Sequence, residues 1–206
     1  IDSEAALTAF NKREAKYEEV KNMPIPSRSI QRPENYFEYS KENHNIPLFK
    51  DGLELRDYQL VGLNWLRKCW YDHKSSILAD EMGLGKTVQG VCMINELFKL
   101  GFRGPYLAIA PKSTLMQWER EFHAWTDLNV VRYSEGKKAR EIIKEYELYW
   151  KGPDGENDER FEKFEVMLMN YEKLVKEDVQ EIVKKFTWEY VVFDEAHRLK
   201  NSNNKT

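Results

Sequence analysis

Apolar residues between positions 54 and 197 follow two spacings in alternation. Short apolar runs of the kind that form buried strands cover residues 75–79, 106–110, 129–133, 164–169 and 189–193. Between these runs the apolar residues recur every three or four positions, which predicts helices over residues 54–73, 86–98, 114–125, 137–150 and 171–185. Strands that alternate with helices indicate βαβ units. We therefore predict an α/β fold with a parallel sheet covered by helices on both faces.

The same periodicity predicts which residues face the core. For the helix over residues 54–73, the predicted buried side carries Tyr58, Val61, Gly62, Trp65, Leu66 and Cys69. For residues 137–150, it carries Ile142, Ile143 and Tyr146. Trp118 is interpreted as a core residue in preference to a residue that supports a ligand contact. Residues 151–160 combine glycines, a proline and several acids, which predicts an exposed loop.

The first 53 residues differ from the rest of the chain. Residues 1–22 are polar and predict a helical segment with only a thin apolar stripe. Four prolines interrupt residues 23–53, which is typical of a linker. Because this linker contains Tyr36, Phe37 and Tyr39, we expect it to lie along a protein surface.

Composition limits the classes of protein to consider. The chain has 206 residues, enough for one large domain or for one domain with an appendage. With 41% hydrophobic residues it can bury a substantial core. Its formal net charge of −3 excludes a polycation, so any contact with nucleic acid must come from a local patch. No apolar run approaches the length of a membrane span.

A glycine-containing loop joins the first predicted strand to the helix that follows it. Gly83 and Gly85 permit backbone conformations that a side chain forbids. A loop that leads into a helix presents free N–H groups and the positive end of the helix dipole, which suit a phosphate. Lys86 adds a positive charge, and Thr87 adds a hydroxyl that suits Mg²⁺. The pattern G-x-x-x-x-G-K-[ST] expects glycine where this chain has Asp80, so a purely structural loop is the alternative.

Other helix starts also carry polar residues. Gln59, near the start of the first helix of the main domain, can donate to and accept from the edge of an adenine, although an ordinary exposed glutamine is the alternative. Lys112, Ser113 and the Thr114 hydroxyl lie between a buried strand and a helix, where they could bind a nucleic-acid phosphate. Thr114 with Gln117 forms a capping-box pattern for that helix.

An acidic pair ends the last predicted strand. Asp194 and Glu195 directly follow residues 189–193, and carboxylates at such a position are costly unless they are paired or used. Because parallel strand ends gather at one edge of a sheet, we expect Asp194 close to Lys86 and Thr87. Asp194 is then placed to hold Mg²⁺ and Glu195 to orient or deprotonate the attacking water, which suits phosphoryl transfer. A satisfied structural pair is the alternative.

Several of these motifs resemble the first motor lobe of Swi/Snf-type chromatin-remodelling ATPases, within helicase superfamily 2. The resemblance rests on residues 55–59, 77–87, 109–114 and 194–201. Aspartate at position 80 is that family's own variant of the phosphate loop. Four further stretches are most similar to the chromodomain-helicase-DNA-binding (CHD) subgroup, with the imitation-switch subgroup second: residues 118–122, 125–126, 128–133 and 144–147. The segment before residue 53 resembles, less specifically, the end of a chromodomain region and its linker.

The resemblance implies a RecA-like ATPase lobe of the P-loop class over residues 54–206, with ATP and Mg²⁺ as cofactors. The implied nucleotide contacts are Gln59, Asp80, Gly83, Gly85, Lys86 and Thr87. Thr87 and Asp194 would hold Mg²⁺, and Glu195 would activate water. His197, at the end of the DEAH motif, would couple this site to the DNA-binding motifs.

The resemblance also implies contacts with the DNA backbone. Lys112, Ser113 and Asn170 would make them. Family members more often have a small hydroxylated pair where Met169 and Asn170 stand, so the contact from Asn170 departs from the family's pattern. Such motors translocate on duplex DNA and shift nucleosomes in the nucleus, and an adjacent chromodomain would contact histones.

The sequence ends soon after the acidic pair, so we expect a first lobe without the second ATPase lobe that supplies an arginine finger. We therefore expect this 206-residue piece to bind nucleotide weakly and to turn it over negligibly. Two other functions stay open. One is a nucleotide-gated binding module without motor activity, and the other is a tether, over residues 1–50, for a histone-binding module.

Overall fold

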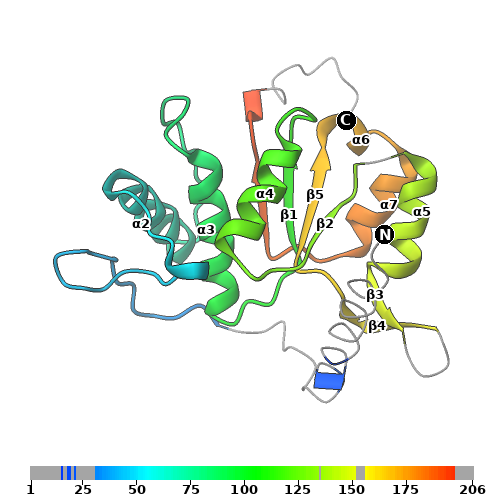
Figure 1. Cartoon of the computed structure of the whole chain (residues 1–206), viewed down its shortest axis with the longest axis horizontal. Coiled ribbons are helices and arrows are strands. Elements are labelled where there is room, and N and C mark those ends of the chain that lie inside the picture. Colours follow the sequence, from blue (N-terminus) through cyan, green and yellow to red (C-terminus); the bar gives the residue numbers. More distant parts are fainter. Residues whose placement is uncertain are drawn as a thin grey trace.

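Four parallel strands form the central sheet (Figure 1). β1 (Tyr106–Ala110) pairs with β5 (Val166–Asn170) on one side and with β6 (Tyr190–Phe193) on the other, and β2 (Val130–Arg132) pairs with β5. The order is therefore β2-β5-β1-β6. The computed structural model describes residues 15, 18–19, 21, 31–134, 136–151 and 156–197, and residue 161 by its backbone alone. The parallel pairing confirms the predicted α/β fold.

The sheet separates two hydrophobic cores, because successive side chains of a strand point to opposite faces. On one face, the even-numbered residues of β1 pack with α2 (Asp57–Tyr71), α3 (Lys86–Lys99) and α4 (Leu115–Trp125). On the other face, Leu107 and Ile109 pack with α5 (Lys137–Tyr146) and α7 (Glu177–Lys185). The short helix α6 (Tyr171–Leu174) joins β5 to α7. Among the described helices, none has the length and apolar character needed to cross a bilayer.

The buried side of α2 differs from the predicted one. Leu60 and Leu63 point into the core, whereas Val61 is 68% exposed and Trp65 is 42% exposed. Of the predicted set, only Leu66 is buried. The prediction was wrong because α2 carries apolar residues on two sides, and α3 packs against the leucine side.

Residues 75–79 form no strand, contrary to the prediction. A strand requires hydrogen bonds to a neighbouring strand. In the described part of the chain, β6 is the last strand on this side of the sheet, and residues 75–79 do not pair with it. Leu78 packs against the core, but Ile77 is 83% exposed. The apolar run therefore marks a segment that lies beside the core without joining the sheet.

The region after α5 also differs from the prediction. α5 ends at Tyr146, and the residues beyond it form β3 (Tyr149–Lys151), which pairs antiparallel with β4 (Asn157–Glu162) where a loop was predicted. The two aromatic residues of β3 are buried, and aromatic residues favour strands over helices. Ile142 is 60% exposed and Tyr146 is 56% exposed, so the predicted inward side of α5 was also wrong, with only Ile143 packed against the core.

Residues 31–53, which we call the strap, lie against α2 and α3. The Tyr36 hydroxyl donates to the carbonyl oxygen of Asn64 at 2.8 Å. The backbone of Tyr39 exchanges two hydrogen bonds with the Asn64 side chain, at 2.9 and 2.8 Å. These contacts confirm that the aromatic residues of the strap anchor it to a surface. The strap ends with a 3₁₀ helix, η1 (Lys50–Gly52).

The strap covers Arg67 of α2, whose side chain is only 2% exposed. The guanidinium group lies 4.1 Å from the ring centre of Tyr39 and 4.7 Å from that of Phe37. Arg67 Nε lies 4.0 Å from a carboxylate oxygen of Glu96 on α3, and the Tyr39 hydroxyl donates to the same oxygen. Burial, and then Glu96, raises the pKa of the Tyr39 hydroxyl. The strap thus completes the surroundings of a buried ion pair that joins α2 to α3.

Some sequence predictions concern residues outside the described ones. The predicted helix over residues 1–22 is represented by residues 15, 18, 19 and 21, which are helical. Residue 22, the first part of the predicted linker, residues 23–30, and the end of the acidic motif, residues 198–201, lie outside the described residues.

Candidate functional site

Two loops lie at the same end of the sheet (Figure 1). One is the glycine loop, residues 80–87, which leads into α3. The other is the acidic strand end, residues 194–197, which follows β6. Because the four strands are parallel, their carboxyl ends meet at this edge, which is where open α/β sheets bind ligands.

Gly83 and Gly85 determine the shape of the glycine loop. Their φ angles are +86° and +77°, in the left-handed region that favours glycine. Gly85 is also the N-cap residue of α3, so no side chain at this position caps the helix. The N–H groups of the first helical turn therefore have no intrahelical partners. A Cβ atom on Gly85 would lie 2.4 Å from Nε2 of Gln59, so a side chain there requires the end of the Gln59 side chain to move.

Lys86 closes the glycine loop on itself. Its ammonium group donates to the carbonyl oxygen of Asp80 at 2.6 Å and to that of Glu81 at 2.9 Å. Both acceptors are neutral, and a charged phosphate oxygen is a stronger acceptor for an ammonium group. The lysine is therefore held where a phosphate can replace the two carbonyl groups.

Gln59 holds the glycine loop from α2. Its side-chain oxygen accepts from the N–H group of Arg56 at 3.0 Å, and its Nε2 donates to the carbonyl oxygen of Leu84 at 3.2 Å. The residue is 8% exposed. Both ends of the amide are thus engaged within the protein. The contact between Gln59 and adenine stays a prediction, and it requires the amide to exchange at least one of these partners.

Gln89 is a site residue that the sequence reasoning missed. It is fully buried in α3, and its Nε2 donates to Oδ2 of Asp80 at 3.2 Å. Its other amide atom, Oε1, has no hydrogen-bond partner among the described residues and lies against Gly62 of α2. The sequence did contain a signal for this residue, because Gln89 is a polar side chain among the inward-facing apolar positions of the helix. The side chain of Asp80 is therefore tied to the helix that follows the loop.

Asp194 is held by three neighbouring elements. Its N–H group donates to the carbonyl oxygen of Ile109 at 2.8 Å, and its carbonyl oxygen accepts from the Tyr171 hydroxyl at 2.6 Å. Its carboxylate oxygen Oδ2 accepts from the indole Nε1 of Trp118 at 2.9 Å and from the Thr114 hydroxyl at 3.3 Å. Thus β1, α4 and α6 all contribute to the position of this residue.

The Thr114 side chain does not cap α4, so the capping-box prediction was wrong. Its single O–H is shared between the carbonyl oxygen of Pro111, at 3.1 Å, and Oδ2 of Asp194, at 3.3 Å. Trp118 is 3% exposed and packs in the core, which confirms that part of the prediction. The hydrogen bond from its indole N–H could not be foreseen from the spacing of apolar residues.

Glu195 and His197 lie on the solvent side of the strand end. Glu195 has a φ angle of +52°, which is uncommon for a residue with a side chain and is often found at functional sites. Its carboxylate lies 3.1 Å from Nδ1 of His197. The two side chains are 44% and 68% exposed, so both are accessible to solvent.

The predicted DNA contacts differ in their accessibility. Lys112 and Ser113 are exposed in the turn between β1 and α4. Asn170 is 2% exposed and donates to Oε2 of Glu172 at 2.7 Å. All three contacts stay predictions, and the one from Asn170 requires its side chain to turn outward.

The residues at this edge fit a nucleotide with Mg²⁺. The start of α3 and the Lys86 ammonium group offer donors to phosphates. Thr87 and Asp194 offer a hydroxyl and a carboxylate, and Mg²⁺ takes such ligands together with phosphate oxygens and water. Throughout the described ranges, no three His, Cys, Asp or Glu side chains gather into a metal site. Nor does a hydrogen bond join Asp194 to Lys86 or Thr87 there.

The parallel sheet, the glycine loop before α3 and the acidic strand end define a RecA-like α/β domain. A model of the SNF2-related domain matches residues 58–206. The chain belongs to this SNF2-related family.

Curated relatives indicate the subgroup. Chromodomain-helicase-DNA-binding protein 8 of Danio rerio is 39% identical over 202 residues, which cover 98% of this chain and 8% of that protein. Human chromodomain-helicase-DNA-binding protein 6 is 45% identical over 157 residues, which cover 76% of this chain and 6% of that protein. Human chromodomain-helicase-DNA-binding protein 7 is 44% identical over 165 residues, which cover 80% of this chain and 5% of that protein. The chain is CHD-like, and the imitation-switch alternative is not favoured.

Solved structures confirm the RecA-like fold. The SWI2/SNF2 ATPase core of Sulfolobus solfataricus in complex with dsDNA aligns with a TM-score of 0.60 and 30% identity, over 74% of this chain and 28% of that chain. The ATPase core domain from the same organism aligns with a TM-score of 0.56 and 27% identity, over 72% of this chain and 26% of that chain.

Proposed function

We propose that the chain is the ATP-binding half of a DNA-dependent ATPase motor that translocates on duplex DNA and remodels nucleosomes. The observation that supports this most directly is that the glycine loop and the acidic strand end share one edge of the sheet, in a chain of the SNF2-related family. A solved relative forms a complex with dsDNA, and the curated relatives are named as DNA-binding helicases.

In this proposal the glycine loop binds the triphosphate. The backbone of Gly83 and Gly85 and the first N–H groups of α3 surround the phosphates. Lys86 releases its two carbonyl partners and donates to the β- and γ-phosphates, which is favourable because charged acceptors form the stronger hydrogen bonds. Gln59 turns one side of its amide to the adenine edge.

The acidic strand end supports the hydrolysis step. Mg²⁺, held by Thr87 and Asp194, would neutralise charge on the phosphate oxygens. The exposed carboxylate of Glu195 orients the attacking water and takes its proton. His197, which lies 3.1 Å from that carboxylate, orients Glu195 and couples it to the DNA-binding motifs. The protein thus supplies the positioning and the charge that phosphoryl transfer requires.

The turn before α4 contacts the DNA backbone. Lys112 donates to a phosphate with its ammonium group and Ser113 with its hydroxyl, and Asn170 adds an amide once it turns outward. Such contacts do not depend on base sequence, which suits a motor that moves along DNA. Because the net charge of the chain is −3, binding depends on this local group of donors.

Further parts of the same protein would complete the motor. We propose that a second ATPase lobe supplies an arginine, that an adjacent chromodomain contacts histones, and that the protein acts in the nucleus. An arginine finger contributes about 10³–10⁵-fold to turnover in other phosphate-loop enzymes. We therefore expect the 206-residue chain alone to bind nucleotide weakly and to turn it over negligibly.

The test is ATP hydrolysis by the whole protein, with and without nucleosomes, in wild type, Lys86→Ala and Lys68→Ala. Lys68 pairs with Asp72 at 3.0 Å on the solvent side of α2 and serves as a matched control. We expect stimulated turnover in wild type and in Lys68→Ala, and a loss of about 10²–10³-fold in Lys86→Ala. Unchanged stimulated turnover in Lys86→Ala would show that the glycine loop is wrongly assigned. ATP binding without stimulated turnover in the wild type would favour a nucleotide-gated binding module.

A further inference from the structure

Two side chains of the α4 region converge on one oxygen of Asp194. Trp118 Nε1 donates to Oδ2 at 2.9 Å, and the Thr114 hydroxyl lies 3.3 Å from the same oxygen. The other carboxylate oxygen, Oδ1, accepts no hydrogen bond from the part of the protein that the structure describes. The carboxylate is therefore held on one side and open on the other.

The indole of Trp118 is itself fixed by packing. The side chain is 3% exposed. Its Cη2 atom lies 3.0 Å from the place that a Cβ on Gly90 of α3 would take, so the ring rests directly on the α3 backbone. The indole also lies against Phe122, with ring centres 6.1 Å apart. Because the ring cannot turn without displacing α3 or α4, the direction of its N–H group is fixed as well.

The backbone of Asp194 is fixed independently of the indole. Its N–H group is bonded to Ile109 of β1, and its carbonyl group to the Tyr171 hydroxyl of α6. Rotation of the side chain is then the remaining freedom of the residue. The indole N–H of Trp118 restricts it, and so does the Thr114 hydroxyl, which shares its O–H with the carbonyl oxygen of Pro111. Hydrogen bonds to a charged acceptor are stronger than those between neutral groups, so the restriction is substantial.

We propose that Trp118 and Thr114 are positioning residues for the ATPase reaction, which hold Oδ2 of Asp194 so that Oδ1 is presented to Mg²⁺. The inference rests on the proposed function, in which Asp194 is a ligand of Mg²⁺. Neither residue touches the nucleotide. They restrict the orientation of the carboxylate before the ion binds. Binding of the ion therefore costs less conformational entropy.

A purely structural role makes a different prediction, because core packing needs the ring of Trp118 and not its N–H group. Trp118→Phe removes the donor and keeps a phenyl ring in the core, but it also loses the Cη2 and Cζ3 atoms that rest on α3. The same helix offers a matched control in Trp125, whose Nε1 donates to Glu121 at 3.1 Å and whose ring packs on Phe49 of the strap. Trp125→Phe removes the same kind of bond away from the acidic strand end.

The experiment measures DNA-stimulated ATP hydrolysis by the whole protein over a Mg²⁺ titration, for wild type, Trp118→Phe, Thr114→Val and Trp125→Phe. For Trp118→Phe we expect the Mg²⁺ concentration at half-maximal turnover to rise about tenfold, the effect of losing one bond to a charged group. We expect a smaller rise for Thr114→Val and none for Trp125→Phe. Nucleotide binding in the presence of a chelator should match the wild type in all three variants.

The outcomes separate this inference from the proposed function. If the wild type is stimulated and Lys86→Ala is inactive, but neither Trp118→Phe nor Thr114→Val changes the Mg²⁺ dependence, the positioning role alone is overturned. Equal changes in Trp118→Phe and Trp125→Phe overturn it too. If the wild type itself shows no stimulated turnover, the proposed function fails and the inference with it. Should Trp118→Phe unfold, Thr114→Val decides, because its hydroxyl lies outside the core.

Discussion

The glycine loop and the acidic strand end share one edge of the sheet but are held in different ways. Lys86 and Gln89 hold the loop through partners five to nine positions away in the sequence. The carboxylate of Asp194 is held by Trp118 and Thr114, which are 76 and 80 positions away. One half of the site is therefore organised largely by local contacts, and the other by the assembly of the fold.

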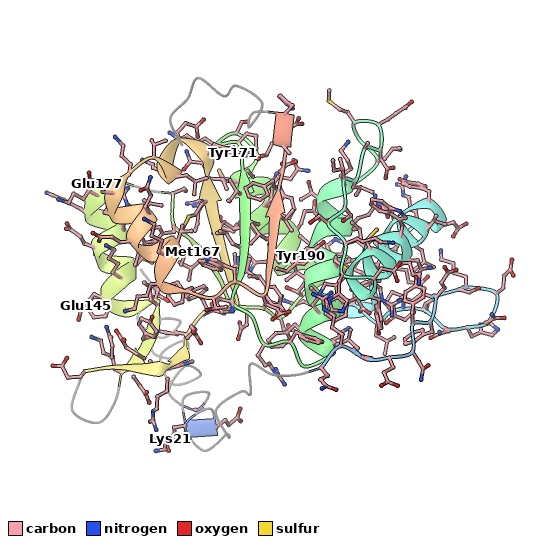
Figure 2. The ribbon with its side chains drawn as sticks, turned by 180° about the vertical axis from the view of Figure 1, so that it is seen from behind. Lys21, Glu145, Met167, Tyr171, Glu177 and Tyr190 are labelled. Atoms are coloured by element: carbon pink, nitrogen blue, oxygen red, sulfur yellow. The ribbon has the colours of Figure 1, made fainter. Side chains whose placement is uncertain are left out.

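Because of this difference, we expect changes in the two halves of the site to affect nucleotide affinity and the free energy of unfolding differently. Lys86 bonds to neutral carbonyl groups, which a charged ligand can replace, and Gln89 bonds to one half-buried carboxylate. The contacts of Asp194 form only when β1, α4 and α6 are in place. Changes in the loop should therefore alter nucleotide affinity first, whereas changes around the acidic strand end should alter turnover or the free energy of unfolding. Figure 2 labels Tyr171, which begins α6 directly after β5 and supports the acidic strand end.

The largest effect is expected from Glu195→Gln in the whole protein. A glutamine cannot take a proton from water, so turnover should fall by about 10²–10⁴-fold. Nucleotide affinity should stay near that of the wild type, because Glu195 is exposed and makes no bond to the glycine loop in the described structure. Hydrolysis rates and binding of a fluorescent nucleotide check both statements. A similar fall in Glu141→Gln, at an exposed position of α5, would contradict the assigned role.

Gly85→Ala should both loosen the loop and weaken nucleotide binding. The positive φ angle and the clash with Gln59 predict a loss of about 1–3 kcal/mol in the free energy of unfolding. The control is Gly136→Ala, because Gly136 is the N-cap residue of α5, has a φ angle of −63° and has free space around it. Urea denaturation compares the two variants. Equal losses would show that the backbone angle and the clash at Gly85 are unimportant.

Tyr171→Phe tests the support of the acidic strand end. It removes the hydrogen bond to the carbonyl oxygen of Asp194, so the free energy of unfolding should fall by about 1 kcal/mol. Nucleotide affinity should not change, since the glycine loop is untouched. Tyr146→Phe, at a side chain that is 56% exposed, is the control and should leave both quantities as they are. A weaker affinity in Tyr171→Phe would mean that the two halves of the site are coupled.

The smallest effect on stability is expected from Gln89→Leu. The change removes the bond to Asp80 but also a buried oxygen that has no partner in the described structure. These contributions oppose each other, so the free energy of unfolding should change by less than about 1 kcal/mol. Nucleotide affinity should fall because Asp80 loses its anchor. Titration calorimetry with an ATP analogue measures this, with exposed Gln117→Ala as the control, and an unchanged affinity would refute the role of Gln89.

The sequence predicts the central part of the fold well, because β1, β5 and β6 are apolar runs whose partners lie in the chain. It fails for residues 75–79, since an apolar run becomes a strand only when a neighbour supplies hydrogen bonds. It also fails for the buried side of α2. Arg67 faces inward there because the strap supplies aromatic rings and a carbonyl group around its guanidinium. A prediction from helical periodicity places a charged residue on the exposed side of a helix.

For the candidate site, the sequence predicts residue types and the edge at which they gather, because motif spacing and strand direction determine both. It does not predict which atoms they contact. Lys86 bonds to its own loop, and Asp194 to an indole and a hydroxyl of the α4 region. Such pairings depend on side-chain direction and on packing between distant elements, neither of which follows from spacing along the chain.

The strap has a practical consequence for recombinant expression. The family match begins at residue 58, which would be a natural place to cut an expression clone. A fragment that began there would lose Phe49 and Leu55 from the core, and the burial of each stabilises the fold by about 1.5–3 kcal/mol. It would also lose the aromatic rings that cover Arg67. The freshly exposed apolar surface would favour aggregation. A clone intended for crystallisation should therefore begin upstream of residue 31.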